Sequence, residues 1–430
     1  MSSRRTFLEK SALLAVSAFT SNSLFQHLHA TGFDKAALLL NNTVPDALNE
    51  DYWATIQDAY PASKSDIIIL NNGGVSPQPL SVQTALDKYN AEASKGPSYY
   101  MWRVMDKGRE PLRRQLAALA GTDPEEIAIN RNATEALNTV IFGLPLQRGD
   151  EVIGTTKDYP NMMNAWKQRQ LRDGIVYKQL SFHFPVENDE EIVKAFAAAI
   201  TPNTKILHLT HVINWIGQIL PVRKLADLAH SRGIEVLVDG AHSFGLLDFK
   251  IPDLHCDYFG TSLHKFLSAP VGSGMLWIKK DKIGKIWPLL CNDQPQGSNI
   301  RKFETLGTRS FAIEQAIGEA INFHNAIGAK RKEDRVRYLK NYWAEKALAI
   351  PGVKIHTSLK APYSCAICGV SIDGVKPADL EAHLLVDYKI NTTPVSYDDM
   401  HFVRVTPHVY TKTEHLDKLL LALGNLAAKA

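Results

Sequence analysis

Lys265 and Asp239 are the residues whose types and spacing most directly suggest chemistry. Asp239 ends the apolar run 236–238, and an acid at the end of a buried strand is costly unless it is paired. Lys265 follows 26 positions later, between apolar residues and hydroxyls, where its pKa would fall and imine formation would be favoured. A pyridoxal phosphate (PLP) ring could use both groups, because the carboxylate would keep the pyridine nitrogen protonated. Taken singly, Asp239 could cap a turn and Lys265 could be solvated.

The segment 130–136 (NRNATEA) adds a place for an anion, because a strand ends there and a helix begins. Free backbone N–H groups and the helix dipole attract phosphate at such a point, and Thr134 adds a hydroxyl. A plain helix N-cap is the simpler alternative. Ser262 and His264, on either side of Leu263, could also contact phosphate oxygens. In an α/β sheet these segments would meet beyond the carboxyl ends of the strands.

The elements that would position these residues alternate between helix and strand from about residue 111. Apolar strand patterns alternate with helices of about ten residues, which is typical of βαβ units. We therefore predict an α/β fold with a mainly parallel seven-stranded sheet and a smaller α+β domain. The expected strands are 126–130, 151–155, 176–181, 205–212, 234–238, 258–262 and 274–279. After residue 307 we expect one long helix, 313–341, and a final helix, 413–428.

The chain of 430 residues is longer than one hydrophobic core usually supports, so we expect several parts. These are a signal peptide (1–30), a segment packing near the small domain and active site (31–79), a large PLP-binding domain (80–320) and a small domain (321–430). The net charge of +3 gives no reason to expect a nucleic-acid partner. We found no internal apolar run near the ~20 residues of a membrane span.

The first 30 residues resemble a twin-arginine export signal. Arg4 and Arg5 precede Phe7-Leu8 and a short apolar run, 11–19, with a candidate cleavage site at Ala30. An amphipathic N-terminal helix is the alternative. Since the twin-arginine machinery carries folded proteins, it would suit an enzyme that captures its cofactor in the cytoplasm. We therefore expect a periplasmic location for the mature chain.

In order and strand placement, these motifs resemble fold-type I PLP-dependent enzymes of the class V aminotransferase family, in the isopenicillin N epimerase-like branch. The resemblance covers about 71–421 and implies that Lys265 is the imine lysine and Asp239 the partner of the pyridine nitrogen. It implies that His242 reaches the phenolic oxygen or the imine, Tyr159 stacks on the ring, and Asn214 lies near the ring O3′ and the substrate carboxylate. It also implies a phosphate cup formed by Ala133, Thr134, Ser262 and His264.

Further roles follow from the same resemblance. Thr308, in the segment 307–309 (GTR), resembles the loop that completes the phosphate site of a second subunit, which implies a homodimer. Arg404 is similar to the clamp for the substrate α-carboxylate, a task that suits a bidentate guanidinium. Asn72 and Gly74, in the segment 71–77 (NNGGVSP), resemble a loop that lines the substrate pocket.

The cysteines argue against desulfuration by persulfide transfer. Cysteine desulfurases need a nucleophilic cysteine before the arginine strand, and 391–400 (NTTPVSYDDM) has none. Cys365 and Cys368 belong to an expected strand, 364–372, where residues three apart lie roughly 10 Å from each other, too far for a disulfide. Zinc would need two more nearby ligands. We therefore predict buried structural thiols and no metal site.

The sequence thus predicts an enzyme that acts at Cα of an amino-acid substrate, or an amino-acid side group, through an imine with Lys265. Transamination, racemisation and β-elimination all start from removal of the Cα proton, and the sequence leaves them open. Together with the export signal, the chain is similar to periplasmic PLP enzymes that tailor the glutamate side chain of pyoverdine siderophores. The alternatives are a PLP-dependent C–S or β-lyase and a non-catalytic sensor. The presence of Lys265, Asp239 and Arg404 disfavours the sensor.

Overall fold

The computed structural model describes residues 47–429. The expected signal peptide 1–30 and the first part of the segment 31–79 lie outside the described residues. Within 47–429, no helix combines the length and the apolar character needed to cross a bilayer.

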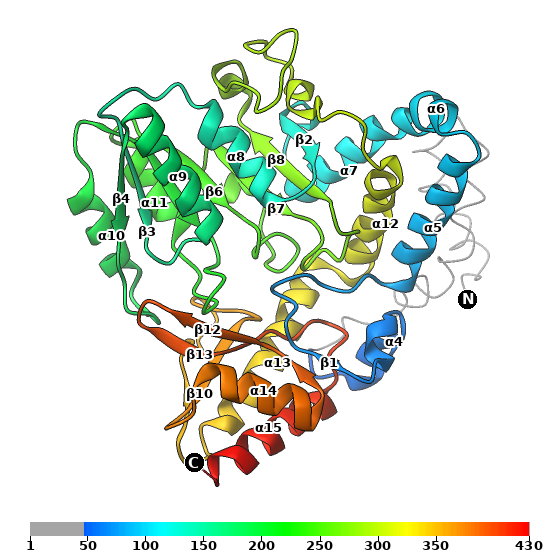
Figure 1. The fold of residues 1–430 in the computed structure, drawn as a ribbon, viewed down its shortest axis with the longest axis vertical. Coiled ribbons are helices and arrows are strands. Elements are labelled where there is room, and N and C mark those ends of the chain that lie inside the picture. Colours follow the sequence, from blue (N-terminus) through cyan, green and yellow to red (C-terminus); the bar gives the residue numbers. More distant parts are fainter. Residues whose placement is uncertain (1–46, 430) are drawn as a thin grey trace, which may run out of the picture. The chain divides into compact units, whose positions relative to one another are not determined.

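Seven strands form the central sheet, in the order β2-β8-β7-β6-β5-β3-β4 (Figure 1). β8 is antiparallel to both of its neighbours, whereas the pairs from β7 across to β4 are parallel. The predicted α/β fold with a mainly parallel seven-stranded sheet is therefore confirmed. The strands are β2 (Ile127–Asn130), β3 (Glu151–Thr155), β4 (Val176–Leu180), β5 (Thr204–Thr210), β6 (Glu235–Asp239), β7 (Tyr258–Ser262) and β8 (Gly274–Ile278).

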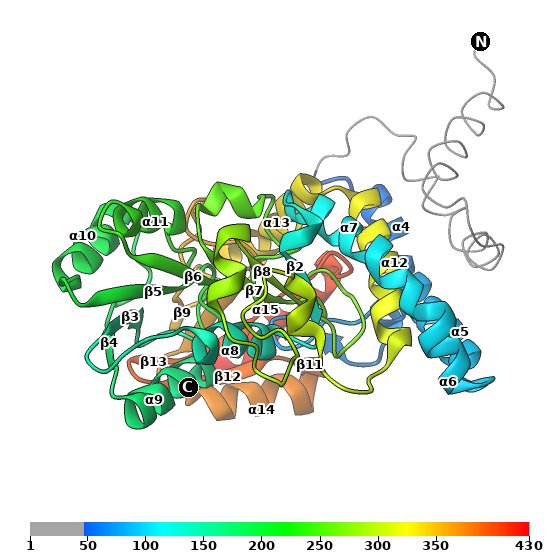
Figure 2. The same cartoon turned by 90° about the horizontal axis from the view of Figure 1, so that it is seen from above.

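Helices cover both faces of this sheet and form two hydrophobic clusters. One cluster joins the sheet to α7, α10, α11 and α12, and the other joins it to α8 and α9. In Figure 2, α10 and α11 lie on one side of the sheet and α9 on the opposite side. The helices are α7 (Arg109–Ala120), α8 (Ala133–Gly143), α9 (Pro160–Asp173), α10 (Asp189–Ala199), α11 (Val222–His230) and α12 (Phe311–Ile327).

The centre of the sheet explains where the functional residues can lie. β6 is buried on both faces, so it is a continuous apolar run instead of an alternating one. Its last residue, Asp239, lies in register with Thr210 of β5 and with Gly260 of β7. Because these strands are parallel, their carboxyl ends meet at one edge, and the segments that follow them come together there.

The prediction of one long helix over 313–341 is wrong in one respect, because the helix is interrupted at Gly328. Gly328 has a φ of +92°, outside the right-handed helical region, so α12 ends at Ile327 and a second helix, α13 (Ala329–Ala347), begins in a new direction. Ile321 of α12 belongs to the core of the large sheet, whereas Leu339 of α13 belongs to a third cluster. The change of core therefore falls near Gly328, and the boundary expected at 320/321 lies inside α12.

The third cluster supports a second, antiparallel sheet in the order β12-β13-β10-β9. A short parallel pair, β1 with β11, ties the N-terminal segment to this part of the chain. The strands are β1 (Ile68–Ile69), β9 (Val353–Ile355), β10 (Cys368–Ile372), β11 (Ile390–Asn391), β12 (Thr393–Tyr397) and β13 (Met400–Val405). The remaining helices are α4 (Glu50–Asp58), α5 (Leu80–Ser94), α6 (Pro97–Tyr99), α14 (Pro377–Tyr388) and α15 (Thr413–Ala427).

Short 3-10 and π turns connect several of these elements. They are η1 (Pro61–Lys64), η2 (Tyr100–Val104), η3 (Met105–Gly108), η4 (Pro124–Glu126), η5 (Ile251–Leu254), η6 (Lys280–Lys285) and η7 (Ile300–Glu304). The strand expected over 364–372 is shorter than predicted, because β10 begins at Cys368 and Cys365 precedes it. Both thiols are free and buried, so the prediction of buried structural cysteines is confirmed.

The break at Gly328 yields a test of backbone strain. The Gly328→Ala variant should lower the free energy of unfolding by about 1–3 kcal/mol, because alanine tolerates this φ poorly although a Cβ there meets no atom within 4 Å. Gly424→Ala is the matched control. It lies inside α15, also meets nothing within 4 Å, and should raise that free energy by about 0.5–1 kcal/mol. Urea unfolding of both variants measures the difference, and equal effects would contradict the strain argument.

Candidate active site

Lys265 lies on the turn that follows β7, and its amine faces His242, which follows β6. Lys265 Nζ is 3.2 Å from His242 Nε2, and the same Nε2 is 2.8 Å from the carbonyl oxygen of Gly73. A carbonyl only accepts hydrogen bonds, so we infer that His242 Nε2 carries the hydrogen. Lys265 can share that hydrogen only through a lone pair, so the contact favours an unprotonated amine.

The electrostatics of the site favour the same state. Burial lowers the pKa of Lys265 to about 8; the nearby Asp239 carboxylate opposes this shift and Arg404 adds to it. Burial also lowers the pKa of His242 well below its usual value, with help from the charges of Lys265 and Arg404. A neutral amine beside a neutral imidazole is the arrangement needed for attack on an aldehyde.

Asp239 is buried at the end of β6 and lacks an ion-pair partner within residues 47–429. Its Oδ1 accepts a hydrogen bond from the backbone N–H of Ala241 at 2.9 Å. Burial raises the pKa of Asp239, and the Ala241 hydrogen bond and His208 oppose that rise. A carboxylate in this state is stabilised when a cationic ring nitrogen pairs with it, so the position fits the pyridine nitrogen of PLP.

The start of α8 was predicted to hold a phosphate, and two of its backbone N–H groups are used within the chain. Asn132 caps the helix by accepting from the backbone N–H of Glu135 at 2.9 Å. The N–H of Ala133 donates to Ser262 Oγ at 2.9 Å, so the start of α8 and the end of β7 are in direct contact. The Thr134 hydroxyl makes no hydrogen bond to any described residue and is available to a ligand. His264 lies nearby in the chain, with Nδ1 3.2 Å from the carbonyl oxygen of Ser273.

Arg404 is a buried guanidinium without a carboxylate partner among the described residues. Its Nη1 donates to the carbonyl oxygen of Asn214 at 2.9 Å, and its Nη2 donates to Asn71 Oδ1 at 2.7 Å. Its Nε has no partner in residues 47–429, and burial lowers the pKa of the group to about 10. A buried cation with unused donors is a binding site for an anion such as a carboxylate.

The loop 71–77 is arranged differently from the sequence expectation. Asn72 is fully buried and uses its side chain within the protein: it donates to the carbonyl oxygens of Ile69 and Thr406 and accepts from Tyr410. It therefore holds the loop, and Asn71 is the neighbour that reaches Arg404. Two adjacent asparagines look alike in a sequence, so only the bridge between Asn71 and Thr406 decides which one faces the site.

The glycines of this loop permit a close approach to the arginine. A Cβ on Gly73 would lie 3.3 Å from Arg404 Cζ, which is a tight contact. Gly74, which the sequence placed at the substrate pocket, donates its backbone N–H to the carbonyl oxygen of Asn71 at 3.1 Å. Gly74 therefore closes the turn that presents Asn71 and the Gly73 carbonyl.

The remaining predicted residues lie as follows. Asn214 is buried, and its Oδ1 has no partner within the described range, so it is free to meet a ligand. Tyr159, the N-cap of α9, is 39% exposed and lies close enough to Arg404 to raise the pKa of that guanidinium slightly. Thr308 is exposed and forms no side-chain hydrogen bond to residues 47–429. Asn214, His242 and Lys265 thus follow β5, β6 and β7 at one edge of the sheet. Arg404 contacts the Asn214 carbonyl there, and the start of α8 contacts Ser262 at the end of β7.

Asp158 is a buried acid that the sequence analysis missed. It accepts from the backbone N–H and hydroxyl of Thr155 and from the hydroxyl of Thr210, at 2.8, 2.9 and 2.8 Å. Burial raises its pKa to about 6. These bonds tie the turn that carries Tyr159 to β3 and β5. Its adjacency to Tyr159 was the only signal in the sequence.

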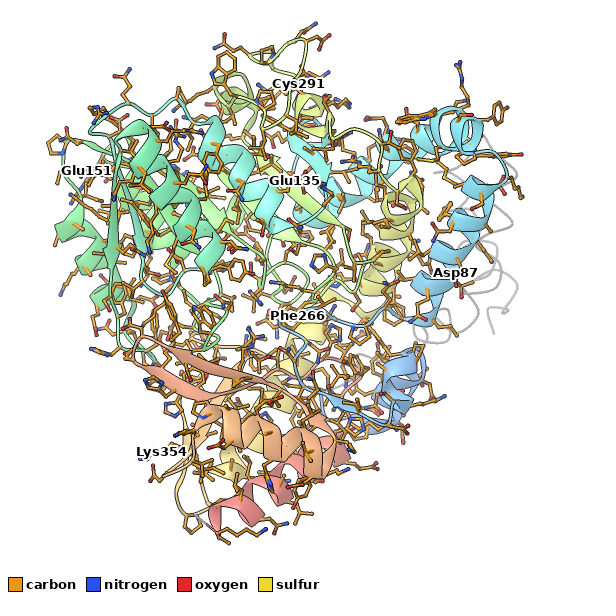
Figure 3. The ribbon with its side chains drawn as sticks, viewed as in Figure 1. Asp87, Glu135, Glu151, Phe266, Cys291 and Lys354 are labelled. Carbon is orange, nitrogen blue, oxygen red and sulfur yellow. The ribbon has the colours of Figure 1, made fainter. Side chains whose placement is uncertain are left out.

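None of the four cysteines, all of which are described, is placed to act as a nucleophile. Cys291 is exposed, and Figure 3 shows it at the far end of the large domain from Phe266, the neighbour of Lys265. Burial raises the pKa of Cys365 to about 12 and that of Cys368 to about 11, so neither forms a thiolate readily. Cys256 is buried too, and burial raises its pKa.

Comparisons with known proteins identify the family and the fold. Residues 68–394 match the family model described as aminotransferase class-V. Isopenicillin N epimerase of Amycolatopsis lactamdurans is 28% identical over 83% of this chain and 94% of its own length. A "Probable cysteine desulfurase" of Halalkalibacterium halodurans is 28% identical over 75% of this chain and 82% of its own. The solved structure of a C-DES mutant with glycine covalently linked to the PLP cofactor covers 86% of this chain and 99% of its own, with 21% identity and a TM-score of 0.77.

The pKa of Lys265 predicts how cofactor capture depends on pH. When PLP is added to the apoprotein, the absorbance band of bound cofactor should form faster as the pH rises, with a midpoint at about 8, because only the unprotonated amine attacks the aldehyde. Lys265→Ala should give no band at any pH. The control Lys279→Ala, which removes an exposed lysine after β8, should keep the wild-type midpoint. A midpoint near the ordinary lysine value of 10.5, or a band in Lys265→Ala, would contradict the assignment.

Proposed function

The chain belongs to the aminotransferase class-V family and is a PLP-dependent enzyme, and from this premise we propose that it removes the Cα proton of an amino-acid substrate. Lys265 is the proposed base, and Arg404 the proposed clamp for the α-carboxylate. The observation that carries the proposal is the buried Arg404 guanidinium, which has no carboxylate partner within residues 47–429. An amino acid supplies that carboxylate.

The chain's own residues would orient the substrate and move the proton. When bound, PLP supplies an electron sink that stabilises negative charge at Cα. Arg404, with the Asn214 side-chain NH2 as a second donor, would fix the carboxylate and so direct the Cα–H bond toward Lys265 Nζ. His242 Nε2–H, 3.2 Å from that nitrogen, would hold the amine in its unprotonated form before it takes the proton.

Persulfide transfer does not form part of this proposal, although relatives include a protein named as a cysteine desulfurase. The hairpin formed by β12 and β13 carries no cysteine, and the two buried thiols nearest to it in sequence, Cys365 and Cys368, have raised pKa values. The epimerase relative is the one that favours chemistry at Cα alone. Transamination and epimerisation are therefore the reactions that we propose, and C–S or β-elimination is the alternative outcome of the test.

The test compares amino acids with amines that lack the α-carboxylate. The wild-type enzyme in D2O should exchange the Cα hydrogen of its amino-acid substrate. Arg404→Met should lower kcat/KM for that substrate by about 100-fold or more, because a buried charge pair is worth a few kcal/mol. The matching amine is the control, and its rate should change far less. Equal losses of kcat/KM for the amino acid and for the amine would contradict the role of Arg404 as the clamp. Release of sulfide or pyruvate without exchange of the Cα hydrogen would favour the lyase.

We also propose that the mature chain acts in the periplasm, where an amino-acid side group of a siderophore is a candidate substrate. The support is the sequence of residues 1–30, with Arg4 and Arg5 ahead of an apolar run. In a bacterium with a twin-arginine translocase, the protein should appear in the periplasmic fraction with its leader removed. Changing both arginines to lysine should leave an uncut chain in the cytoplasm. A wild-type protein found uncut in the cytoplasm would refute export.

A homodimer is a further part of the proposal. Thr308 lies on an exposed loop and makes no side-chain hydrogen bond inside the described part of the chain, so its hydroxyl is available to a second subunit. Family resemblance assigns this loop to the phosphate site of the partner. The proposed second copy would thus complete a cup that Ala133, Thr134 and Ser262 form only in part.

A further inference from the structure

Lys332 is a buried lysine that the proposed chemistry does not use. It lies in the first turn of α13, where its backbone N–H donates to the carbonyl oxygen of Gly328 at 3.0 Å. Its side chain is buried, and its Nζ donates to the carbonyl oxygen of Phe266, the residue directly after Lys265. Within residues 47–429, Lys332 forms no ion pair and no other side-chain hydrogen bond.

Burying the Lys332 amine in this way costs folding free energy. Removing an amine from water without a counter-ion is unfavourable, and here burial lowers the pKa of Lys332 to about 7. The neighbouring imidazoles of His324 and His408 are also buried, and Lys332 helps to lower their pKa values. These groups supply no negative charge, so the carbonyl oxygen of Phe266 is the specific partner that the structure gives to Lys332.

The turn that carries Lys265 is braced at other points by distant parts of the chain. The backbone N–H of Ser268 donates to the carbonyl oxygen of Lys265 at 3.0 Å, and Ser268 has a φ of +60°, which is unusual for a residue other than glycine. Ser268 Oγ accepts from Tyr60 at 3.2 Å and lies 3.4 Å from His408 Nε2. The ring of Phe266 stacks on His408, with centroids 5.8 Å apart and an angle of 5° between the planes.

These contacts hold different parts of the turn that carries Lys265. Tyr60 and His408 hold Ser268 at the end of the turn, and the N–H of Ser76 donates to the carbonyl oxygen of His264 before it, at 3.0 Å. Lys332 holds the peptide unit between Phe266 and the next residue. A shift of that peptide would move Lys265 Nζ relative to His242, and a misplacement of about 1 Å is enough to disturb a reacting group.

We propose that Lys332 is a positioning residue for Lys265: by holding the Phe266 carbonyl, it fixes where the Lys265 amine stands between His242 and Asp239. The proposal rests on Lys265 as the cofactor-binding lysine, which the Lys265→Ala experiment tests separately. It differs from a merely structural role, in which Lys332 would stabilise the fold and leave the site unchanged.

The same helix offers a matched control. Lys340, eight residues further along α13, is also fully buried and unpaired with any described carboxylate. Its Nζ donates to the carbonyl oxygen of Ser358 at 3.0 Å and to Ser364 Oγ at 2.6 Å, in a part of the chain that does not contact the Lys265 turn. Lys332→Met and Lys340→Met thus remove the same group from the same helix with similar burial.

The experiment measures the bound cofactor and the fold separately, on the holoenzyme. Lys332→Met should move the pH midpoint of the absorbance of bound PLP by about half a unit or more, and should speed PLP release by about tenfold or more. Lys340→Met should leave the pH midpoint and the rate of PLP release unchanged, even if it lowers Tm as much as Lys332→Met does. Lys332→Arg, which keeps a donor and a charge, should restore part of the change. The proposal would be overturned if Lys332→Met kept the wild-type pH midpoint and PLP release rate. Equal changes of these two quantities in Lys332→Met and Lys340→Met would also overturn it.

Hydrogen exchange on the wild-type holoenzyme is a second test, and it needs no variant. The peptide covering 263–269 should exchange as slowly as β7, because its backbone is held at Phe266 and Ser268. The mostly exposed segment 288–293, whose backbone makes no hydrogen bond to any described residue, is the internal reference. Exchange of 263–269 as fast as that reference would overturn the proposal, since a loosely held turn cannot be positioned by Lys332.

Discussion

Burial of charge without a matching counter-charge is the constraint on which the rest of this structure depends. Asp239, Lys265 and Arg404 lie in one site and form no ion pairs among the described residues; Asp239 and Arg404 are almost fully removed from water, and Lys265 is partly buried. Each would cost several kcal/mol if left uncompensated. The protein compensates in part through backbone partners and through a shift of the Lys265 pKa to about 8. A charged cofactor and a substrate carboxylate would supply the missing counter-charges.

The residues of this site are positioned by two different hydrophobic cores, so the two cores must pack in a fixed arrangement. The large sheet supplies Asp239 and Lys265, whose strands are fixed by the parallel register of β5, β6 and β7. The antiparallel sheet supplies Arg404 on β13, which reaches back to the Asn214 carbonyl that follows β5. The hairpin of β12 and β13 is also tied to the large domain, because buried Lys157 pairs with Asp398 and Asp399 at its tip. Trp215, next to Asn214, stacks on Tyr397 of β12 with centroids 5.1 Å apart.

The tip of this hairpin bears on the reactions that we propose. The chain shares its fold with a C–S lyase structure and its sequence with an epimerase and a desulfurase homologue. Its hairpin tip carries acids that pair with Lys157, and no thiol. An ion pair of this kind can hold the hairpin close to the Tyr159 turn.

By itself, the sequence determined the features that depend on local pattern. Continuous apolar runs predicted the seven strands, a helical period predicted most helices, and an acid and a lysine after two such strands predicted the cofactor-binding edge. The break at Gly328, the choice of Asn71 over Asn72, and the burial of Asp158 and Lys332 were decided by tertiary structure. The last three depend on segments far away in the chain: Thr406 for the asparagines, Thr210 for Asp158 and Phe266 for Lys332. A local pattern shows that a side chain is polar, but only the packing of distant segments determines whether water, a carbonyl or a ligand becomes its partner.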